Sequence, residues 1–194
     1  MVIKMDAIYD FIINLITTTG SLGMMLDCLL IVSESIIPPL PLGLFITVLC
    51  VNYGYVIGFL ISWIFTIIGC MISYYLFQTI FKGIVDRKLR KYEFANKLLT
   101  MIDKMTFSNL VLLISLPITP AFLVNIVAGV SNMKVNKFLP ALMIGKISLV
   151  VFWGYVGTSL IEALKNPMIL IKVGIIIIIM FIVSKIINKK LNLD

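Results

Sequence analysis

The chain contains apolar runs that are too long and too poor in charge for a water-soluble fold. Residues 52–81 carry no charged side chain, residues 138–161 carry one lysine, and residues 167–187 carry two. About 20 apolar residues suffice for a helix to cross the hydrocarbon of a bilayer. Hydrophobic residues make up 61% of the chain and charged residues 13%, against about 45–50% and about 25% in soluble domains. We therefore expect an all-α integral membrane protein in which these three segments are spans.

Two further apolar blocks are interrupted by prolines. Pro38 and Pro41 interrupt the first block, and Pro117 and Pro120 interrupt the second. Proline lacks a backbone donor and clashes with the preceding helical turn, and it biases the residue before it away from the helix. We expect the chain to reverse at both places, and the alternative is two merely kinked helices.

The positions of the basic residues indicate how these blocks enter the membrane. No Lys or Arg lies between Lys4 and Lys82, whereas residues 82–104 contain seven. Lysines and arginines beside apolar spans mark the cytoplasmic face. Because Lys134 and Lys137 flank the second block on its other side, both of its ends are expected on that face. The second block is then a re-entrant hairpin, and the first enters from the outer face.

The predicted architecture is an inverted repeat of two proline-broken re-entrant hairpins, each followed by a transmembrane helix, plus a C-terminal transmembrane helix. Interrupted segments in corresponding halves are typical of a binding site near the midplane of the membrane. A chain of 194 residues leaves room for one membrane domain, residues 1–194. Its expected parts are the first hairpin with its span (22–81), a basic cytoplasmic segment (82–104), the second hairpin with its span (105–161) and the C-terminal span (167–187).

The N-terminal block, residues 7–32, is less regular and predicts a helix pair or a broken span whose orientation stays open. No cleavable signal peptide is expected, since no small-residue cleavage site follows a clean apolar core.

The composition also excludes several kinds of chemistry. Histidine is absent, which removes Ser-His-Asp catalysis and His-ligated metal sites. The cysteines, Cys28, Cys50 and Cys70, are single residues in apolar runs and form no CxxC motif. No clustered set of acids suggests hydrolysis or phosphoryl transfer. We therefore expect no enzyme activity, no catalytic residue, no metal and no cofactor, and we interpret the net charge of +7 as a juxtamembrane belt rather than a nucleic-acid surface.

The two hairpins carry motifs that resemble a known family. The first reads Glu34-x-x-x-Pro38-x-x-Pro41-x-Gly43, followed by Asn52-Tyr53-Gly54. The second runs from Leu116 to Lys146 and contains a proline pair followed by Asn125, Gly129, Phe138 and Gly145. These patterns resemble the DedA family of bacterial membrane proteins and its VTT-domain (SNARE-associated Golgi protein) branch. One departure is that the family's arginine before the second proline pair is replaced by Ile114 and Ser115, so its role is absent or falls to a lysine.

The resemblance implies a function in lipid handling. It suggests translocation of lipids between leaflets, of the flippase or scramblase type, in support of envelope homeostasis in a bacterial cytoplasmic membrane. The substrate would be a polyprenyl-phosphate carrier or a phospholipid. Membrane lipids with phosphate headgroups are therefore the expected partners, while a homo-oligomer and coupling to protons stay open. The alternatives are a proton- or ion-coupled transporter of a small solute and a non-transporting membrane assembly factor.

Candidate residues for the substrate path or gate fall into two groups. Ionisable groups within a membrane are functional by default, so Glu34 is the first candidate, although it could also sit in the outer interface or cap a helix. Asp27 is a second carboxylate nearby. Lys146 could extend to the cytoplasmic face or pair with a carboxylate or headgroup. Polar residues that could bind substrate or satisfy freed carbonyls, and residues that shape the loops, are Ser115, Thr119, Asn125, Pro38, Pro41, Gly43, Pro117, Pro120 and Gly129.

Overall fold

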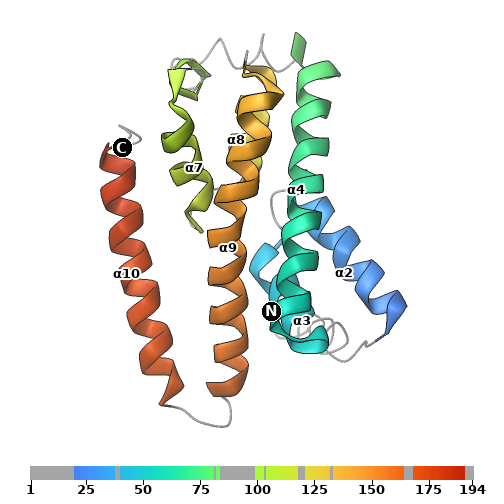
Figure 1. Ribbon diagram of the computed structural model, residues 1–194, viewed down its shortest axis with the longest axis vertical. Helices are drawn as coiled ribbons and strands as arrows, with labels where there is room; N and C mark the ends of the chain where they lie inside the picture. The colour runs from blue at the N-terminus through green and yellow to red at the C-terminus, as the bar shows by residue number, and fades with distance from the viewer. Residues whose placement is uncertain are drawn as a thin grey trace, which may run out of the picture.

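The computed structural model of the chain is built from helices (Figure 1). It describes residues 20–37, 40–80, 82–83, 99–102, 104–117, 121–131, 133–163 and 168–190. None of these residues lies in a strand, so the expected all-α class is confirmed for the described part. The helices are α2 (Ser21–Glu34), α3 (Leu42–Tyr53), α4 (Tyr55–Thr79), α7 (Phe107–Ser115), α8 (Ala121–Val130), α9 (Val135–Ala163) and α10 (Ile169–Lys190).

Three helices in the described part are long and apolar enough to cross a membrane. They are Tyr55–Thr79, Val135–Ala163 and Ile169–Ile187, which confirms the three spans expected from the sequence. The first begins at Tyr55 rather than at residue 52, because Gly54 adopts φ +83° between α3 and α4. This left-handed conformation is open to glycine at no steric cost and separates the two helices.

The two long helices α4 and α9 lie side by side, and each is contacted by both pairs of short helices. Helices α2 and α3 pack on α4, and α3 also packs on α9. Conversely, α7 packs on α9 and α8 packs on α4. Figure 1 shows α2 and α3 beside one half of the long helices and α7 and α8 beside the other half, with α10 on the outside against α9. The fold therefore has a central pair of spans that the two short pairs flank.

Each short pair has its own apolar core. One core joins α4, α7, α8 and the first half of α9, and it includes Tyr74, Leu110 and Phe138. The other joins α2, α3 and the second half of α9, and it includes Ile31, Phe45 and Val150. The two cores lie on the same long helices, so the short pairs are held by a shared frame.

Hydrogen bonds from side chains of α4 fix its alignment with α9. The hydroxyl of Tyr55 donates to the carbonyl of Val151 at 3.2 Å, and the indole of Trp63 donates to the carbonyl of Met143 at 2.9 Å. Trp63 follows Tyr55 in α4 by as many residues as Met143 precedes Val151 in α9, as expected for two antiparallel helices. Near the other end, the hydroxyl of Tyr74 donates to the carbonyl of Met133 at 2.7 Å.

Glycines allow the short helices to approach the long ones closely. A Cβ at Gly43 of α3 would lie 2.5 Å from the Trp153 ring of α9. A Cβ at Gly129 of α8 would lie 2.6 Å from the carbonyl oxygen of Tyr74 in α4. Small residues at helix contacts are typical of membrane proteins, where close packing replaces the hydrophobic effect as the attraction between helices.

The contact at Gly129 predicts a large effect of a small substitution. We expect Gly129→Ala to lower the free energy of unfolding by about 1–3 kcal/mol, because the new methyl group meets the backbone of α4 and requires the helices to move apart. Gly174→Ala on α10 is the matched control, since nothing lies within 4 Å of its Cβ position. Thermal unfolding of the purified protein in detergent would measure both, and equal stability of the two variants would contradict the contact.

Candidate functional site

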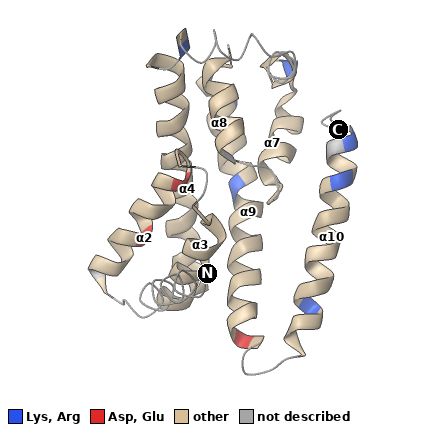
Figure 2. Ribbon diagram, turned by 180° about the vertical axis from the view of Figure 1, so that it is seen from behind, with Lys and Arg blue, Asp and Glu red and all other residues tan. Residues whose placement is uncertain are grey.

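Several polar side chains are buried inside this apolar bundle without a hydrogen-bond partner. They include both carboxylate oxygens of Asp27, Oε2 of Glu34, Nδ2 of Asn125 and Nζ of Lys146. Buried polar groups in proteins are nearly always hydrogen-bonded, so each exception calls for an explanation such as a bound ion, water or ligand. Figure 2 shows acidic positions on α2 and a basic position partway along α9. We take these groups as the candidate site.

Glu34 is brought into the protein by the end of α2. A Cβ at Gly69 of α4 would lie 2.9 Å from the Cα of Val32 and 2.7 Å from the hydroxyl oxygen of Ser35. Since Gly69 has no side chain, the last turn of α2 lies directly on α4. Glu34, the last residue of α2, is 8% exposed as a result. Its placement favours a role inside the bundle over a place in the outer interface.

Lys146 lies on the buried side of α9. It is 1% exposed, and its Nζ is buried with no hydrogen-bond partner. The alternative that this side chain extends to the cytoplasmic surface is therefore wrong. The adjacent Gly145 explains the burial, because a Cβ there would lie 2.8 Å from Ile114 of α7, so α7 packs tightly over this part of α9.

Glu34 and Lys146 act on each other electrostatically. Burial disfavours the ionised carboxylate of Glu34, and the positive charge of Lys146 offsets part of that effect. Neither Glu34 Oε2 nor Lys146 Nζ has a hydrogen-bond partner. The attraction thus acts over more than hydrogen-bond distance. Burying a charge costs several kcal/mol in a low-dielectric interior, and an opposite charge on a neighbouring helix offsets part of that cost.

Asp27 adds a second buried carboxyl to the same helix. It precedes Glu34 by seven residues, which is two helical turns or about 10 Å along the axis. It is 1% exposed. Residues seven apart lie on one side of a helix, so α2 presents two acidic groups to the interior.

The Asn-x-x-x-Gly motif places Asn125 on the side of α8 that faces α4. Gly129 contacts α4 at Tyr74, and Asn125 lies one turn earlier on the same side. Asn125 is 1% exposed. Its unpartnered amide is therefore buried within the bundle.

A row of small polar residues on α4 was not identified from the sequence. Ser62, Thr66 and Ser73 are 0% exposed, and the hydroxyls of Ser62 and Ser73 have no partner. Thr66 instead donates to the carbonyl of Trp63 at 2.9 Å. The signal that could have found them is their spacing with Gly69 along one side of a span.

The remaining predicted residues serve the shape of the loops where the structure describes them. Ser115 donates to the carbonyl of Val111 at 2.7 Å, within its own helix. Pro41 is exposed at the start of α3, and Pro117 is half-buried just beyond α7. Gly43 lies against Trp153, as described above. Pro38, Thr119 and Pro120 lie outside the described residues.

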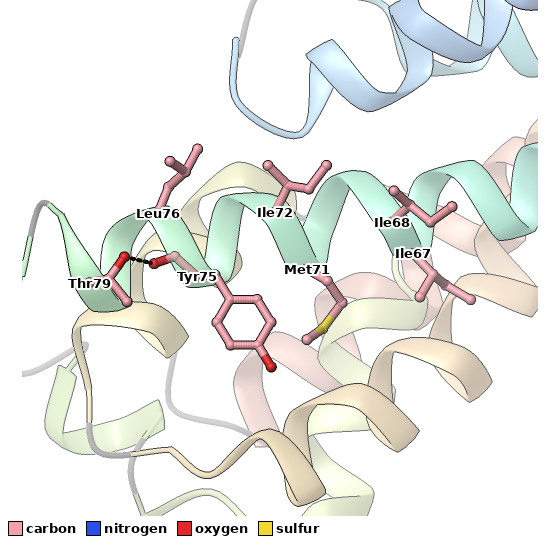
Figure 3. A pocket seen from close by; sticks show the side chains of 7 residues that line it. All are labelled: Ile67, Ile68, Met71, Ile72, Tyr75, Leu76 and Thr79. Atoms are coloured by element: carbon pink, nitrogen blue, oxygen red, sulfur yellow. Dashed lines mark hydrogen bonds between the residues drawn. The ribbon is translucent and has the colours of Figure 1, made fainter.

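An open apolar groove of about 490 Å³ runs along α4, and its lining includes none of the unpartnered polar groups. Figure 3 shows that its lining side chains all come from α4. They are Ile67, Ile68, Met71, Ile72, Tyr75, Leu76 and Thr79. None of these described lining residues is charged, so the groove suits a hydrocarbon chain and not a headgroup.

Within the described ranges, no three His, Cys, Asp or Glu residues gather as metal ligands. The candidate groups come from α2, α8 and α9, and among the described residues the attraction between Glu34 and Lys146 links two of them.

Comparisons with known proteins place the chain among membrane proteins. The family model described as the VTT domain matches residues 39–159. The chain is 23% identical over 183 residues to uncharacterized membrane protein YhjE of Bacillus subtilis (strain 168), covering 94% of this chain and 88% of that protein. It is 22% identical over 175 residues to uncharacterized protein YqeD of the same organism, covering 89% and 83%. No solved structure matches.

The attraction between Glu34 and Lys146 predicts energetic coupling. We expect Glu34→Gln and Lys146→Gln each to lower the free energy of unfolding, because each removes one partner of this attraction. The double variant should lose less than the sum, by about 1 kcal/mol, as for groups that share an interaction. A double-mutant cycle of thermal unfolding measures this term. The exposed Glu162 and Lys172 supply a control cycle, and additive losses at Glu34 and Lys146 would argue against the coupling.

Proposed function

The chain belongs to the VTT-domain (DedA) family of membrane proteins, and from this premise we propose that it moves lipids between the two leaflets of a membrane. The observation that carries the proposal is the set of unpartnered polar groups buried among apolar spans, Asp27, Glu34, Asn125 and Lys146. Such groups are costly unless something polar meets them. A headgroup that passes through the bundle would supply the missing partners, and its hydrocarbon chains would stay in the lipid.

The proposed path lies between two re-entrant hairpins. Helices α2, α3, α7 and α8 contain 14, 12, 9 and 10 residues. At 1.5 Å per residue each is shorter than the roughly 30 Å of hydrocarbon. Two pairs of short helices, each entering and leaving on one face of the membrane, therefore explain these lengths better than two kinked spans. Non-helical backbone at membrane depth has to be buried in protein or line a wet cavity, which suits a polar passage at the turns.

We further propose that the hairpins form an inverted repeat. The first pair approaches from one end of the bundle and the second from the other (Figure 1). The cross-contacts are reciprocal, since α3 of the first half packs on α9 of the second and α8 of the second half packs on α4 of the first. This exchange supports two halves related by an axis in the membrane plane.

The orientation follows from the basic residues. The end of α4, the start of α7, the start of α9 and the end of α10 lie at one end of the molecule (Figure 1). The adjoining sequence contains Lys82, Lys104, Lys134 and Lys137. We assign this end to the cytoplasm, and the bacterial source of the relatives favours a bacterial cytoplasmic membrane.

The proposed substrate is a lipid with a phosphate headgroup, either a polyprenyl phosphate or a phospholipid. Lys146 offers a buried cation. The N-terminus of α3 has no side-chain cap and no acidic residue in its first turn, which suits an anion. The groove on α4 offers apolar surface for a hydrocarbon chain. No bond is made or broken in this process, and we propose no enzyme activity.

One observation favours the alternative of a proton- or ion-coupled transporter. Asp27 buries two unpartnered carboxylate oxygens, and intramembrane carboxylates recur in proton relays. Translocation measured with and without an imposed pH gradient separates passive movement from coupling. A protein that is inert in liposomes under both conditions would favour the assembly factor.

The hairpin arrangement predicts a labelling pattern. Single cysteines at Asn136 and Asn109, which lie in the first turns of α9 and α7, should both react with a membrane-impermeant maleimide from the cytoplasmic side. A cysteine at Glu162, at the other end of α9, should react from the outside. The native cysteines are buried and provide the background control. Opposite-side labelling at residues 109 and 136 would be incompatible with a second re-entrant hairpin.

The proposed role of Glu34 predicts loss of transport. We expect Glu34→Gln to reduce the translocation rate of a fluorescent phospholipid in proteoliposomes by about 100-fold or more, because a neutral amide removes the charge that opposes Lys146. Glu162→Gln, the same change at an exposed position of α9, should keep the wild-type rate. An unchanged rate in the folded Glu34→Gln variant would falsify the role of this carboxylate.

A further inference from the structure

We propose that the segment before α7 closes the cytoplasmic side of the bundle and that Lys137 of α9 holds it in the closed position. The segment consists of residues 99–102, 104 and 105, and we call it the cap segment. The inference rests on the proposed lipid translocation for its purpose, because it names the part that controls access from the cytoplasm. The closure itself is measurable without any lipid substrate.

The cap segment packs on the bundle through one side. Leu99, Ile102 and Met105 are buried, whereas Thr100 and Lys104 are exposed. The buried residues recur at every third position, as on one side of a helical turn. They belong to the core that joins α4, α7, α8 and the first half of α9. The segment therefore covers this core at the end of the molecule assigned to the cytoplasm.

A charged side chain joins the cap segment to α9. The ammonium of Lys137 donates to the backbone carbonyl of Met105, the last residue of the segment. The N–H of Met105 donates to the carbonyl of Ile102 at 3.2 Å, so the accepting carbonyl lies at the end of a turn, where a cation is favourable. Hydrogen bonds to a charged group are stronger than those between neutral groups. Lys137 is half-buried, so water can solvate its ammonium once the contact opens.

Release of the cap segment would free the start of α7. Met105 directly precedes Thr106, whose side chain accepts a bond from the N–H of Asn109 at 3.4 Å and so caps α7. The cap segment is thus continuous with α7, whereas Lys137 belongs to α9, which hydrogen bonds align with α4. The Lys137 contact therefore ties a short helix to the pair of long helices.

The core beneath the cap segment separates the cytoplasm from the buried polar groups. It lies between α4, α7, α8 and α9, and the ring of Tyr74 stacks on the ring of Phe138 with centroids 4.9 Å apart. Ile114 of this core lies against Gly145, next to Lys146. A polar ligand that reaches Lys146 from the cytoplasm has to part these apolar side chains. Displacement of α7 together with its cap segment would part them.

Two native cysteines report this opening. Cys70 of α4 is 0% exposed and belongs to the core beneath the cap segment. Cys50 of α3 is 3% exposed and belongs to the other core. Opening at the cap segment should expose Cys70 and leave Cys50 buried, whereas a general loosening of the bundle should expose both thiols.

Thiol labelling in inverted membrane vesicles tests the proposal. A small membrane-impermeant methanethiosulfonate reagent then acts from the cytoplasmic side, and peptide mass spectrometry separates the cysteines. We expect Lys137→Met, which removes the donor but keeps the length of the side chain, to raise the labelling rate of Cys70 about tenfold. This change in the open fraction corresponds to about 1.4 kcal/mol. Lys137→Arg retains a charged donor and should stay close to the wild-type rate. Lys134→Met is the matched control, since Lys134 is exposed immediately before α9.

A second variant weakens the apolar side of the same contact. Leu99→Ser leaves Lys137 in place and should also raise the labelling of Cys70 above that of Cys50, so the test does not depend on one variant. An unchanged rate at Cys70 in folded Lys137→Met overturns the proposal. An equal rise at Cys70 and Cys50 overturns it as well.

Translocation of a fluorescent phospholipid by the same variants separates this inference from the proposed function. We expect Lys137→Met to translocate the lipid faster than the wild type, because the cytoplasmic side opens more often. Raised labelling of Cys70 in a protein that translocates no lipid contradicts the proposed function and leaves the closure standing. Lipid translocation by the wild type without a response of Cys70 to Lys137→Met does the opposite. Raised labelling with an unchanged translocation rate contradicts the control of access by the cap segment.

Discussion

The antiparallel contact between α4 and α9 is the interaction on which the other packing depends. Trp63 and Tyr55 of α4 donate hydrogen bonds to backbone carbonyls of α9, and such bonds are not replaced by water in the hydrocarbon of a membrane. Both short helix pairs pack on this frame, and each pair contacts both long helices. Because the short helices are kept close by contacts at glycines such as Gly43 and Gly129, small changes at these positions affect the whole bundle.

The placement of charge follows from the same constraint. An apolar environment makes a lone buried charge costly, and the cost is lowered when the group becomes neutral, faces an opposite charge or meets a polar ligand. The structure places Glu34 and Lys146 on α2 and α9, which belong to different halves of the chain. The interior charges are therefore shared between the halves, whereas Lys172 of α10 stays exposed.

Sequence patterns predicted the spans better than the contacts between them. Long apolar runs define a span by length and composition alone, and all three expected spans are present. The exact start of the first span depended on the backbone of Gly54, which composition does not reveal. The burial of Lys146 depended on α7 packing at Gly145, a tertiary contact that a pattern within α9 does not contain. The row at Ser62, Thr66 and Ser73 was missed because small polar residues are common in spans and signal little by themselves.

The bonds from α4 to α9 also bear on how the protein moves. A pair of helices held by Tyr55 and Trp63, with Tyr74 bonded to Met133 just before α9, has little freedom to tilt or slide. The short helices have no comparable series of side-chain bonds to it among the described residues, and their contacts with it are mostly apolar. In the proposed translocation the short helices α2, α3, α7 and α8 would then move, while α4 and α9 would stay in place. Opening a path would thus require a change at the contacts of the short helices, such as those at Gly43 and Gly129, and no relative motion of the two long helices.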